Sequence, residues 1–359
     1  MKRQIIPNNK AGSCYFRTSV IAPYRKAIIQ LTNVCNLHCM HCFVSSIKTG
    51  EYLLYEDIEN MISQFEKLKV IAVTLTGGEP FMHPDIIRII ELLRNNGIQV
   101  SLSTNATLIS EKQIKKLLDF NDVHLKVSLD GFSSKTHGTF RGDKFCFEKT
   151  CETINLLGVN KLISGILVTP NSLTPLEEYI DLCRFAVDNQ VSYVLMNPLS
   201  NFGRGNKSIN SMAISQNMME SIRDMTRQFQ ESINMVYIRF PNKDMPLLGC
   251  ESGRIIYIFT NGDVAICPYL VFAAKNPGSK YDPAEFIAGK VFEQDIDSRI
   301  DNLILKNNTI HEDNIICKSC DFSRDCGKGC PAAVIASGGD FMDIDQDVCP
   351  IMYTKRNPI

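Results

Sequence analysis

Tryptophan is absent from the 359 residues of this chain, and no apolar run is long enough to cross a membrane. The first residues, MKRQIIPNNK, are basic and polar and do not resemble a secretory signal peptide. Lys and Arg number 38 against 39 Asp and Glu, which gives a net charge of -1. This balance removes the electrostatic basis for binding nucleic acid or an anionic membrane. We therefore expect a cytoplasmic protein that binds neither.

Cysteine, in contrast, is abundant, with 14 in the chain. A reducing cytosol disfavours a disulfide framework, so metal binding is the better explanation for most of them. One short motif holds three of the 14 and the last third of the chain holds seven. The remaining cysteines, Cys14, Cys146, Cys151 and Cys183, are isolated among apolar neighbours, and we expect them to be small buried side chains.

Strand-like and helix-like segments alternate from residue 26 to about residue 200. The expected strands are residues 27–31, 71–75, 100–103, 125–129, 163–168 and 193–196. Thr174 and Pro175 mark one helix start, with Thr174 as its cap and Pro175 as its first residue. This alternation predicts parallel strands with right-handed connections, in a barrel or in an open doubly wound sheet.

The pattern changes after about residue 236. The segment RIIYIFTNGDVAIC predicts a hairpin that turns at Asn261 and Gly262, and cysteine-dense loops follow it. We therefore expect an N-terminal extension over residues 1–25, an α/β barrel domain over 26–235, and a small metal-stapled domain over 236–359.

The stretch CNLHCMHC spaces Cys35, Cys39 and Cys42 as C-x3-C-x2-C, just after the first expected strand. Zinc sites and four-iron clusters usually take four protein ligands, so three cysteines leave one metal position open to a substrate or cofactor. A zinc site completed by His38 or His41 is the competing interpretation, but this spacing is unusual for zinc.

The segment TGGEP, residues 76–80, directly follows the second expected strand. In barrels of this kind the chemistry lies at the carboxyl ends of the strands, so both motifs fall on the same catalytic face. Glycines allow the backbone to approach a ligand closely, and the carboxylate of Glu79 can pair with an ammonium group.

In this order, the two motifs resemble those of the radical S-adenosylmethionine (SAM) superfamily. The resemblance implies a partial (β/α)6 barrel of the TIM type and a [4Fe–4S] cluster held by Cys35, Cys39 and Cys42, with SAM on the fourth iron. The implied SAM-binding residues are Gly77, Gly78, Glu79 and Pro80, His41 in place of an aromatic residue, Ser103 and Ser128 at strand ends, and Arg141 in HGTFRG. The neighbouring Asn105 and Asp130 are equally explained as ordinary strand-end caps.

The seven cysteines of the last third follow the order C…G-x4-C…C-x2-C-x5-C-x3-C…C, which resembles the SPASM domain of a subgroup of radical SAM enzymes. The resemblance implies two auxiliary [4Fe–4S] clusters, and hence three clusters in all. The outer one would be held by Cys317, Cys320, Cys326 and Cys349, and the inner one by Cys250, Cys267 and Cys330. A zinc-ribbon-like interaction module is the competing interpretation, although seven cysteines do not divide into fours.

The inner set has three cysteines because none lies between Cys250 and Cys267. An open iron, a non-cysteine ligand and a substrate ligand are therefore all compatible with the sequence. Sulfatase maturases of this subgroup carry an acidic residue directly after the cysteine that corresponds to Cys267. Pro268 occupies that position here, which argues against formylglycine formation.

The resemblance implies an enzyme that cleaves SAM reductively to a 5′-deoxyadenosyl radical, which takes a hydrogen atom from the substrate. An electron donor such as flavodoxin or ferredoxin would be a partner. Many enzymes with a SPASM domain oxidatively modify or cross-link ribosomally made peptides, so peptide maturation is the leading hypothesis. The alternatives are dehydrogenation of a small molecule, such as an aminocyclitol or sugar, and a non-enzymatic metal-stapled scaffold.

Two further expectations concern the substrate. About 25 residues precede the first expected strand, too few for a leader-binding domain, so the leader is expected to bind a separate leader-peptide-binding protein or the enzyme body. Residues 197–207 and a loop over 268–281 are expected to border the substrate cavity. The sequence assigns no catalytic general base.

Overall fold

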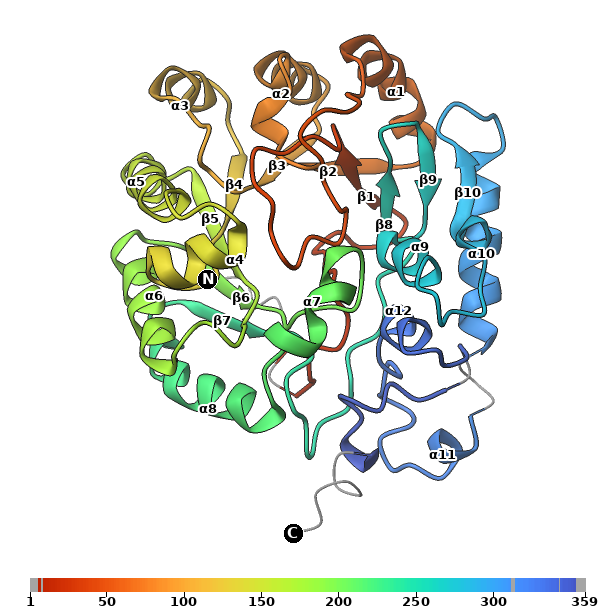
Figure 1. Ribbon diagram of the computed structural model, residues 1–359. Coiled ribbons are helices and arrows are strands. Elements are labelled where there is room, and N and C mark those ends of the chain that lie inside the picture. The colour runs from red at the N-terminus through yellow and green to blue at the C-terminus, as the bar shows by residue number, and fades with distance from the viewer. Residues whose placement is uncertain (1–5, 8, 311–313, 342, 353–359) are drawn as a thin grey trace.

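The computed structural model describes residues 6–7, 9–310, 314–341 and 343–352, with the backbone alone over 305–310. Within these residues a ten-stranded sheet runs in the order β10-β9-β8-β1-β2-β3-β4-β5-β6-β7. Its strands are β1 Arg25–Gln30, β2 Val70–Thr76, β3 Gln99–Thr104, β4 Val123–Ser128, β5 Ile163–Val168, β6 Tyr193–Met196, β7 Asn234–Tyr237, β8 Ile255–Ile258, β9 Asp263–Ala265 and β10 Ile287–Lys290. In Figure 1 the sheet curves around a central opening.

Most helices lie outside this curve (Figure 1). They are α1 Tyr55–Lys67, α2 Ile86–Asn95, α3 Glu111–Leu118, α4 Thr139–Arg141, α5 Cys146–Val159, α6 Leu176–Asp188, α7 Arg204–Met212, α8 Gln216–Thr226, α9 Pro268–Ala274, α10 Ile296–Ile310, α11 Ile315–Lys318 and α12 Pro331–Ala336. Shorter helical turns span Pro80–Met82, Ser134–Gly138, Arg227–Phe229 and Pro283–Phe286. Across the described ranges, none of the helices has the length and apolar character needed to cross a bilayer.

The predicted parallel α/β architecture is confirmed, and the sheet stays open between its edge strands β7 and β10. All six expected strands are present, each within two residues of its predicted limits. A seventh parallel strand, β7, is not among them. It has four residues, NMVY, and it forms because β6 offers it a free edge, which no local pattern reveals.

Strands β2, β3 and β4 separate an apolar outer face from a polar inner face, because successive side chains point to opposite sides. Outward residues such as Val73 and Leu75 of β2 are buried in the main core. The core also contains the apolar stripe of α2, formed by Ile86, Ile89, Ile90 and Leu93. Inward residues of the same strands, such as Thr74 and Ser101, are polar, so the inside of the curve can hold a ligand.

The chain beyond residue 236 continues the barrel sheet. Strand β8 pairs in parallel with β1, and β9 and β10 follow antiparallel. The hairpin between β8 and β9 turns at Asn261 and Gly262 as predicted, with Gly262 at φ +80°. The C-terminal region therefore shares its hydrogen-bonded framework with the barrel.

Two local predictions are wrong. Residues 268–274, expected to begin a loop, form helix α9, which is buried throughout and starts with a proline at its first position. Helix α6 begins at Leu176 with Pro175 as its N-cap, and Thr174 does not cap it. The Thr174 hydroxyl donates instead to the carbonyl of Asp130, 3.0 Å away, so a tertiary contact replaces the local cap.

A buried ion pair ties the end of the barrel to the cysteine-rich region. Arg239, just after β7, donates to both carboxylate oxygens of Asp345, and both side chains are at most 5% exposed. Asp345 also accepts the backbone N–H of Cys330 at 3.0 Å. One carboxylate therefore anchors the barrel edge and a predicted cluster ligand together.

We expect Arg239→Met to lower the free energy of unfolding by about 3–5 kcal/mol, because it leaves the Asp345 carboxylate buried without its partner. Urea denaturation of the metal-free protein measures the change. The matched control is Arg184→Met, which removes an exposed pair with Asp181 and should cost less than about 1 kcal/mol. Equal effects of the two variants would contradict this role of Arg239.

Candidate active site

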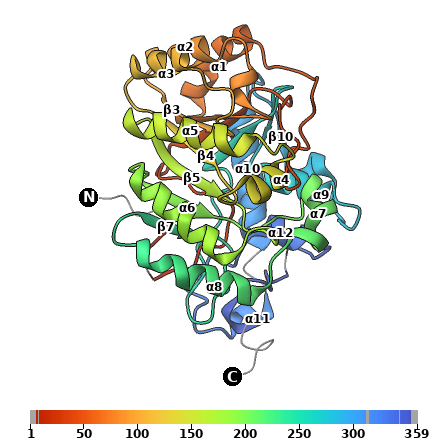
Figure 2. The same cartoon turned by 60° about the vertical axis from the view of Figure 1, so that its left-hand side comes forward.

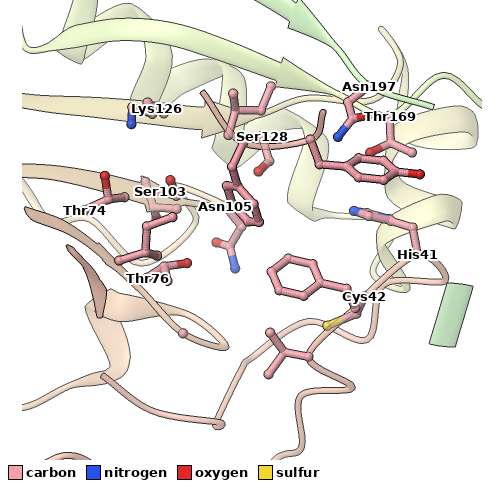
Figure 3. A pocket seen from close by; sticks show the side chains of 18 of the residues that line it. His41, Cys42, Thr74, Thr76, Ser103, Asn105, Lys126, Ser128, Thr169 and Asn197 are labelled. Carbon is pink, nitrogen blue, oxygen red and sulfur yellow. The ribbon is translucent and has the colours of Figure 1, made fainter. Parts of the chain in front are cut away.

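The concave side of the sheet encloses a cavity of about 320 Å³, within the range of small-molecule sites. Figure 3 shows Thr74, Ser103 and Lys126 along the strands, with His41 and Cys42 across the cavity from them. The predicted site residues that line it are Cys35, Cys39, His41, Cys42, Gly77, Gly78, Glu79, Ser103, Ser128 and Arg141. Pro80 does not line it and begins the helical turn Pro80–Met82.

Cys35, Cys39 and Cys42 lie together at one side of this cavity. They form a small buried cluster with Leu37 and Cys146. Backbone N–H groups point at two of the sulfurs, from Leu37 to Cys35 at 3.4 Å and from Ser46 to Cys42 at 3.5 Å. Such donors stabilise thiolates.

The donor set suits a thiolate-bound cluster. Burial raises the pKa of Cys39 to about 12, so its thiolate needs a metal's positive charge to persist. Among the described side chains, no three of His, Cys, Asp or Glu are arranged to hold a single metal ion. An iron–sulfur cluster does not require such convergence, because each thiolate binds a different iron.

Cys146 is buried as predicted but is not isolated, because it packs in the cluster that contains Cys35 and Cys39. It lies at the start of α5, far from the motif in sequence.

Two glycines allow the cysteine loop to approach the end of β2. The N–H of Gly78 donates to the carbonyl of Thr32 at 2.7 Å, and that of Glu79 donates to the carbonyl of Val34 at 2.8 Å. A Cβ atom at Gly78 would collide with the backbone of Val34, and one at Gly77 would collide with Thr32. The TGGEP segment thus extends the pairing of β1 and β2 and fixes the chain that leads into Cys35.

The carboxylate of Glu79 is buried, 1% exposed, and held in one orientation. It accepts hydrogen bonds from the Thr104 hydroxyl at 2.6 Å, the Asn105 N–H at 2.8 Å and the Phe81 N–H at 3.1 Å. Burial nevertheless raises its pKa to about 7, despite these three donors. A carboxylate kept in this state favours a cationic ligand in the cavity.

Arg141 is held by a buried ion pair with Asp130. Its Nε donates to the Asp130 carboxylate at 2.6 Å, and its Nη1 points to the Cys39 sulfur at 3.8 Å. Burial acts to raise the pKa of Asp130, but the guanidinium outweighs it and the pKa is lowered. Asp130 also accepts the N–H of Thr169 at 2.7 Å. Asp130 is therefore a positioning residue for Arg141.

His41 presents a flat neutral ring to the cavity. It stacks on Phe140 with ring centroids 4.6 Å apart and planes at 6°. Burial lowers its pKa to about 4, with a further contribution from Arg141. Its Nδ1 has no hydrogen-bond partner among the residues that the structure describes.

Arg204, at the start of α7, holds the cysteine loop from outside. Its Nε donates to the carbonyl of Cys39 at 2.8 Å, and its Nη1 donates to that of Ser46 at 2.6 Å. The preceding Gly203 has φ +54°, and a Cβ there would collide with the carbonyls of Cys42 and Phe43. Residues 197–207 are predicted from the sequence to border the cavity. Asn197 lines it, whereas Arg204 contacts the cysteine loop that forms part of its wall. Arg204 and Cys39 are more than 150 residues apart in sequence, so no local pattern predicts their contact.

Two lysines on the inner face of the sheet were also missed. Lys26 of β1 and Lys126 of β4 line the same cavity, and their side chains interact. Lys126 donates to the Ser101 hydroxyl at 3.3 Å. In the described part of the chain neither amine has a carboxylate partner, and burial lowers the pKa of both. A period-2 strand pattern identifies inward positions but not a shared cavity.

The C-terminal cysteines gather around two further cavities. Cys317, Cys320, Cys326 and Cys349 line one of them. Cys250, Cys267 and Cys330 line the other, and Cys14 lines it with them. Cys14 is buried as predicted, but it lies close to three other cysteines in space.

Comparisons with known proteins agree with this geometry. Residues 29–186 match the Radical SAM superfamily. The protein AlbA of Bacillus subtilis, which functions in biosynthesis of the antilisterial bacteriocin subtilosin, is 25% identical over 85% of this chain. The mycofactocin maturase MftC of Mycobacterium tuberculosis is 24% identical over 86% of this chain and 78% of its own. This chain spans 66% of the length of AlbA, less than two thirds.

Among solved structures, Streptococcus suis SuiB bound to its precursor peptide SuiA has the same fold. The TM-score is 0.70 at 18% identity, over 90% of this chain and 76% of SuiB. At this identity the likeness concerns the fold.

We expect Gly78→Ala to reduce iron binding by the cysteine motif, because the added methyl group displaces the loop that carries Cys35. Iron per chain after anaerobic reconstitution measures the loss. Gly278→Ala is the control, since a Cβ there meets nothing within 4 Å. Full iron content in Gly78→Ala would contradict the proposed close approach.

We expect the contribution of Lys26 and Lys126 to the stability of the metal-free protein to grow as pH rises above 7, because both bind protons less tightly when folded than when unfolded. Lys126→Met should flatten this dependence and raise stability at neutral pH by about 1–4 kcal/mol. Urea denaturation at several pH values tests it. The exposed Lys116→Met is the control, and an equal change in both variants would refute the expectation.

Proposed function

The chain belongs to the radical SAM superfamily, and on this premise we propose that it is an enzyme that oxidatively modifies or cross-links a ribosomally made peptide. The observation that carries the proposal is the single cavity shared by Cys35, Cys39, Cys42 and Glu79. It brings a three-thiol site with room for a further ligand next to a buried carboxylate that favours a cation.

Cys35, Cys39 and Cys42 would hold a [4Fe–4S] cluster, and SAM would bind beside it. When both are bound, reductive cleavage of SAM supplies the 5′-deoxyadenosyl radical that removes a hydrogen atom from the substrate. The protein's own contribution is to bind, orient and shield. Arg204 keeps the cysteine loop closed through the carbonyls of Cys39 and Ser46, which limits the freedom of all three ligands.

The SAM-binding roles follow from the polarity of each side chain. Glu79 would accept the ammonium group of SAM, with Gly77, Gly78 and Pro80 shaping the backbone around it. Arg141 would attract the carboxylate of SAM while Asp130 fixes its orientation. Ser103 and Ser128 would contact polar groups of the ribose or carboxylate, and His41 would contact the adenine ring.

His41 suits an adenine ring in particular. Its ring is already stacked on Phe140 and neutral at physiological pH, so it adds no charge next to the positive sulfonium.

Two auxiliary [4Fe–4S] clusters complete the proposed cofactor set. The outer one would be held by Cys317, Cys320, Cys326 and Cys349, which share a cavity. The inner one would include Cys250, Cys267 and Cys330, which share another. These clusters define a SPASM-type domain over residues 236–359, after a barrel over 26–235 and an N-terminal extension over 1–25.

A peptide substrate is supported by the relatives AlbA and MftC, which align with most of this chain. The same proposal includes a flavodoxin or ferredoxin as electron donor and a separate leader-binding protein as partner. It also includes a cytoplasmic location, which suits thiols that must stay reduced. Pro268 at the start of α9 offers no acid or base after Cys267, which disfavours formylglycine formation.

The first test counts iron and acid-labile sulfide in anaerobically reconstituted protein. About twelve irons per chain are expected, falling to about eight in a Cys35/Cys39/Cys42→Ala variant. The wild type should convert SAM to 5′-deoxyadenosine and methionine with a reductant, and the variant should not. Zinc in place of iron, or no SAM cleavage at full iron content, would reject the proposal.

The second test concerns the substrate. Peptides of about 15–30 residues that include a leader segment are incubated with enzyme, SAM and reductant. A peptide substrate loses two hydrogen atoms per modification, in step with 5′-deoxyadenosine formation. If aminocyclitols or sugars are oxidised and no peptide is, the peptide proposal fails while the radical SAM chemistry stands.

Glu79→Gln should weaken SAM binding about 10- to 100-fold, the scale of a hydrogen bond to a charged group. With a pKa of about 7, Glu79 loses its charge as pH falls, so wild-type affinity for SAM should decline below pH 7. The variant has no such group and should show a flatter profile. Equilibrium dialysis with labelled SAM measures both, and a variant that still binds tightly with an unchanged profile would exclude this role.

Glu91→Gln, on the exposed face of α2, is the matched control. It should bind SAM as the wild type does. Equal iron content in all three proteins ensures that the comparison reports on SAM rather than on the cluster.

A further inference from the structure

The cavity of the proposed inner cluster is lined by four cysteines rather than three. Cys14 joins Cys250, Cys267 and Cys330 there, although it precedes the first strand and lies outside the seven-cysteine pattern. Its side chain is 3% exposed. The side chains of Cys14, Cys250, Cys267 and Cys330 therefore meet at one cavity.

The backbone on the N-terminal side of Cys14 is fixed against the segment that leads to Cys250. Ala11 and Gly12 form parallel bridges with Leu247 and Ile238. The Ser13 hydroxyl donates to the carbonyl of Leu248 at 2.6 Å. A Cβ at Gly12 would meet the carbonyl oxygen of Tyr237 at 2.6 Å, so a glycine is needed for this approach.

The C-terminal side of Cys14 is fixed in the same way. Arg17 donates to the carbonyl of Gly249 at 2.7 Å and pairs with the carboxylate of Glu251 at 3.1 Å. Both residues flank Cys250. The residues on both sides of Cys14 thus contact residues next to Cys250. These contacts fix the direction of the Cys14 side chain.

Cys14 also contacts the segment of Cys330. Its thiol donates to the carbonyl of Gly329 at 3.4 Å. The N–H of Cys330 is in turn fixed by Asp345 at 3.0 Å, which is paired with Arg239. The segments that carry Cys14, Cys250 and Cys330 are therefore fixed to one another around the same cavity.

We propose that Cys14 is the fourth ligand of the inner auxiliary [4Fe–4S] cluster. The inference rests on the proposed function, because it requires that this cluster be present. It assigns a residue to the position that the sequence pattern leaves open. With four thiolates, the inner cluster has no iron free for the substrate, so its role is to carry electrons rather than to bind the substrate.

The test uses the full chain in the Cys35/Cys39/Cys42→Ala background, which removes the SAM-binding cluster and leaves about eight irons per chain. Cys14→Ala is added to this background. Cys183→Ala, a buried thiol in α6, serves as the matched control. The readouts are iron content after a chelator challenge and the EPR spectrum of the reduced clusters, with carbon-13-labelled cyanide as a probe for an open iron.

We expect the background protein and Cys183→Ala to keep about eight irons and to show no cyanide coupling. Cys14→Ala should lose iron to the chelator, down to about four to seven per chain, or should show carbon-13 coupling from bound cyanide. Iron retention and spectra equal to those of Cys183→Ala would overturn the proposal. Cyanide coupling in the background protein would overturn it too, because it would reveal an iron that Cys14 does not ligate.

Cys14→Ser covers the case in which Cys14→Ala does not fold. An alkoxide ligand retains the cluster but shifts its EPR signal, and an unshifted signal would count against ligation. If the background protein holds no iron at all, the proposed auxiliary clusters fail, and with them the proposed function. Eight irons with an inert Cys14 would reject the present inference alone.

Discussion

The pairing of the cysteine loop with the end of β2 is the contact on which the site depends. Two backbone hydrogen bonds, from Gly78 to Thr32 and from Glu79 to Val34, bring a metal-binding loop and a ligand-binding segment to the same edge of the sheet. They require two residues without a Cβ at that point. The buried carboxylate of Glu79, the orientation of Cys35 and the opening of the cavity all follow from this approach.

The sheet itself explains how the site can be polar inside and stable outside. Its outer face packs on the helices, while the inner face of β1 to β4 carries hydroxyls and amines. A closed barrel would fill this interior with side chains. The open sheet instead continues past β1 into β8, β9 and β10, so the cysteine-rich region is joined to the cavity wall by main-chain hydrogen bonds. The barrel and the C-terminal region consequently share one framework, and α9 and α12 lie beside α7 in Figure 2.

A structural feature could be predicted from the sequence when the residues that determine it are close together in the chain. The six strands, the hairpin at Gly262 and the cysteine motifs are encoded over a few residues each, and the structure has those strands and that hairpin. The cap at Thr174, the role of Arg204 and the surroundings of Cys14 depend on residues tens to hundreds of positions away. Cys14 illustrates the limit, because the cysteines that line its cavity lie far from it in sequence, where no local pattern reveals them.

The docking of residues 11–17 onto residues 247–251 has a consequence for biogenesis. Ser13 leaves the ribosome before its partner Leu248, which follows 235 residues later. At typical rates of about 5–20 residues per second, that partner appears no sooner than roughly ten seconds afterwards. Contacts so distant along the chain also form slowly. Throughout this interval Cys14 lacks the contacts that bury it in the folded protein, so its thiol stays accessible to oxidants until the C-terminal region has been made.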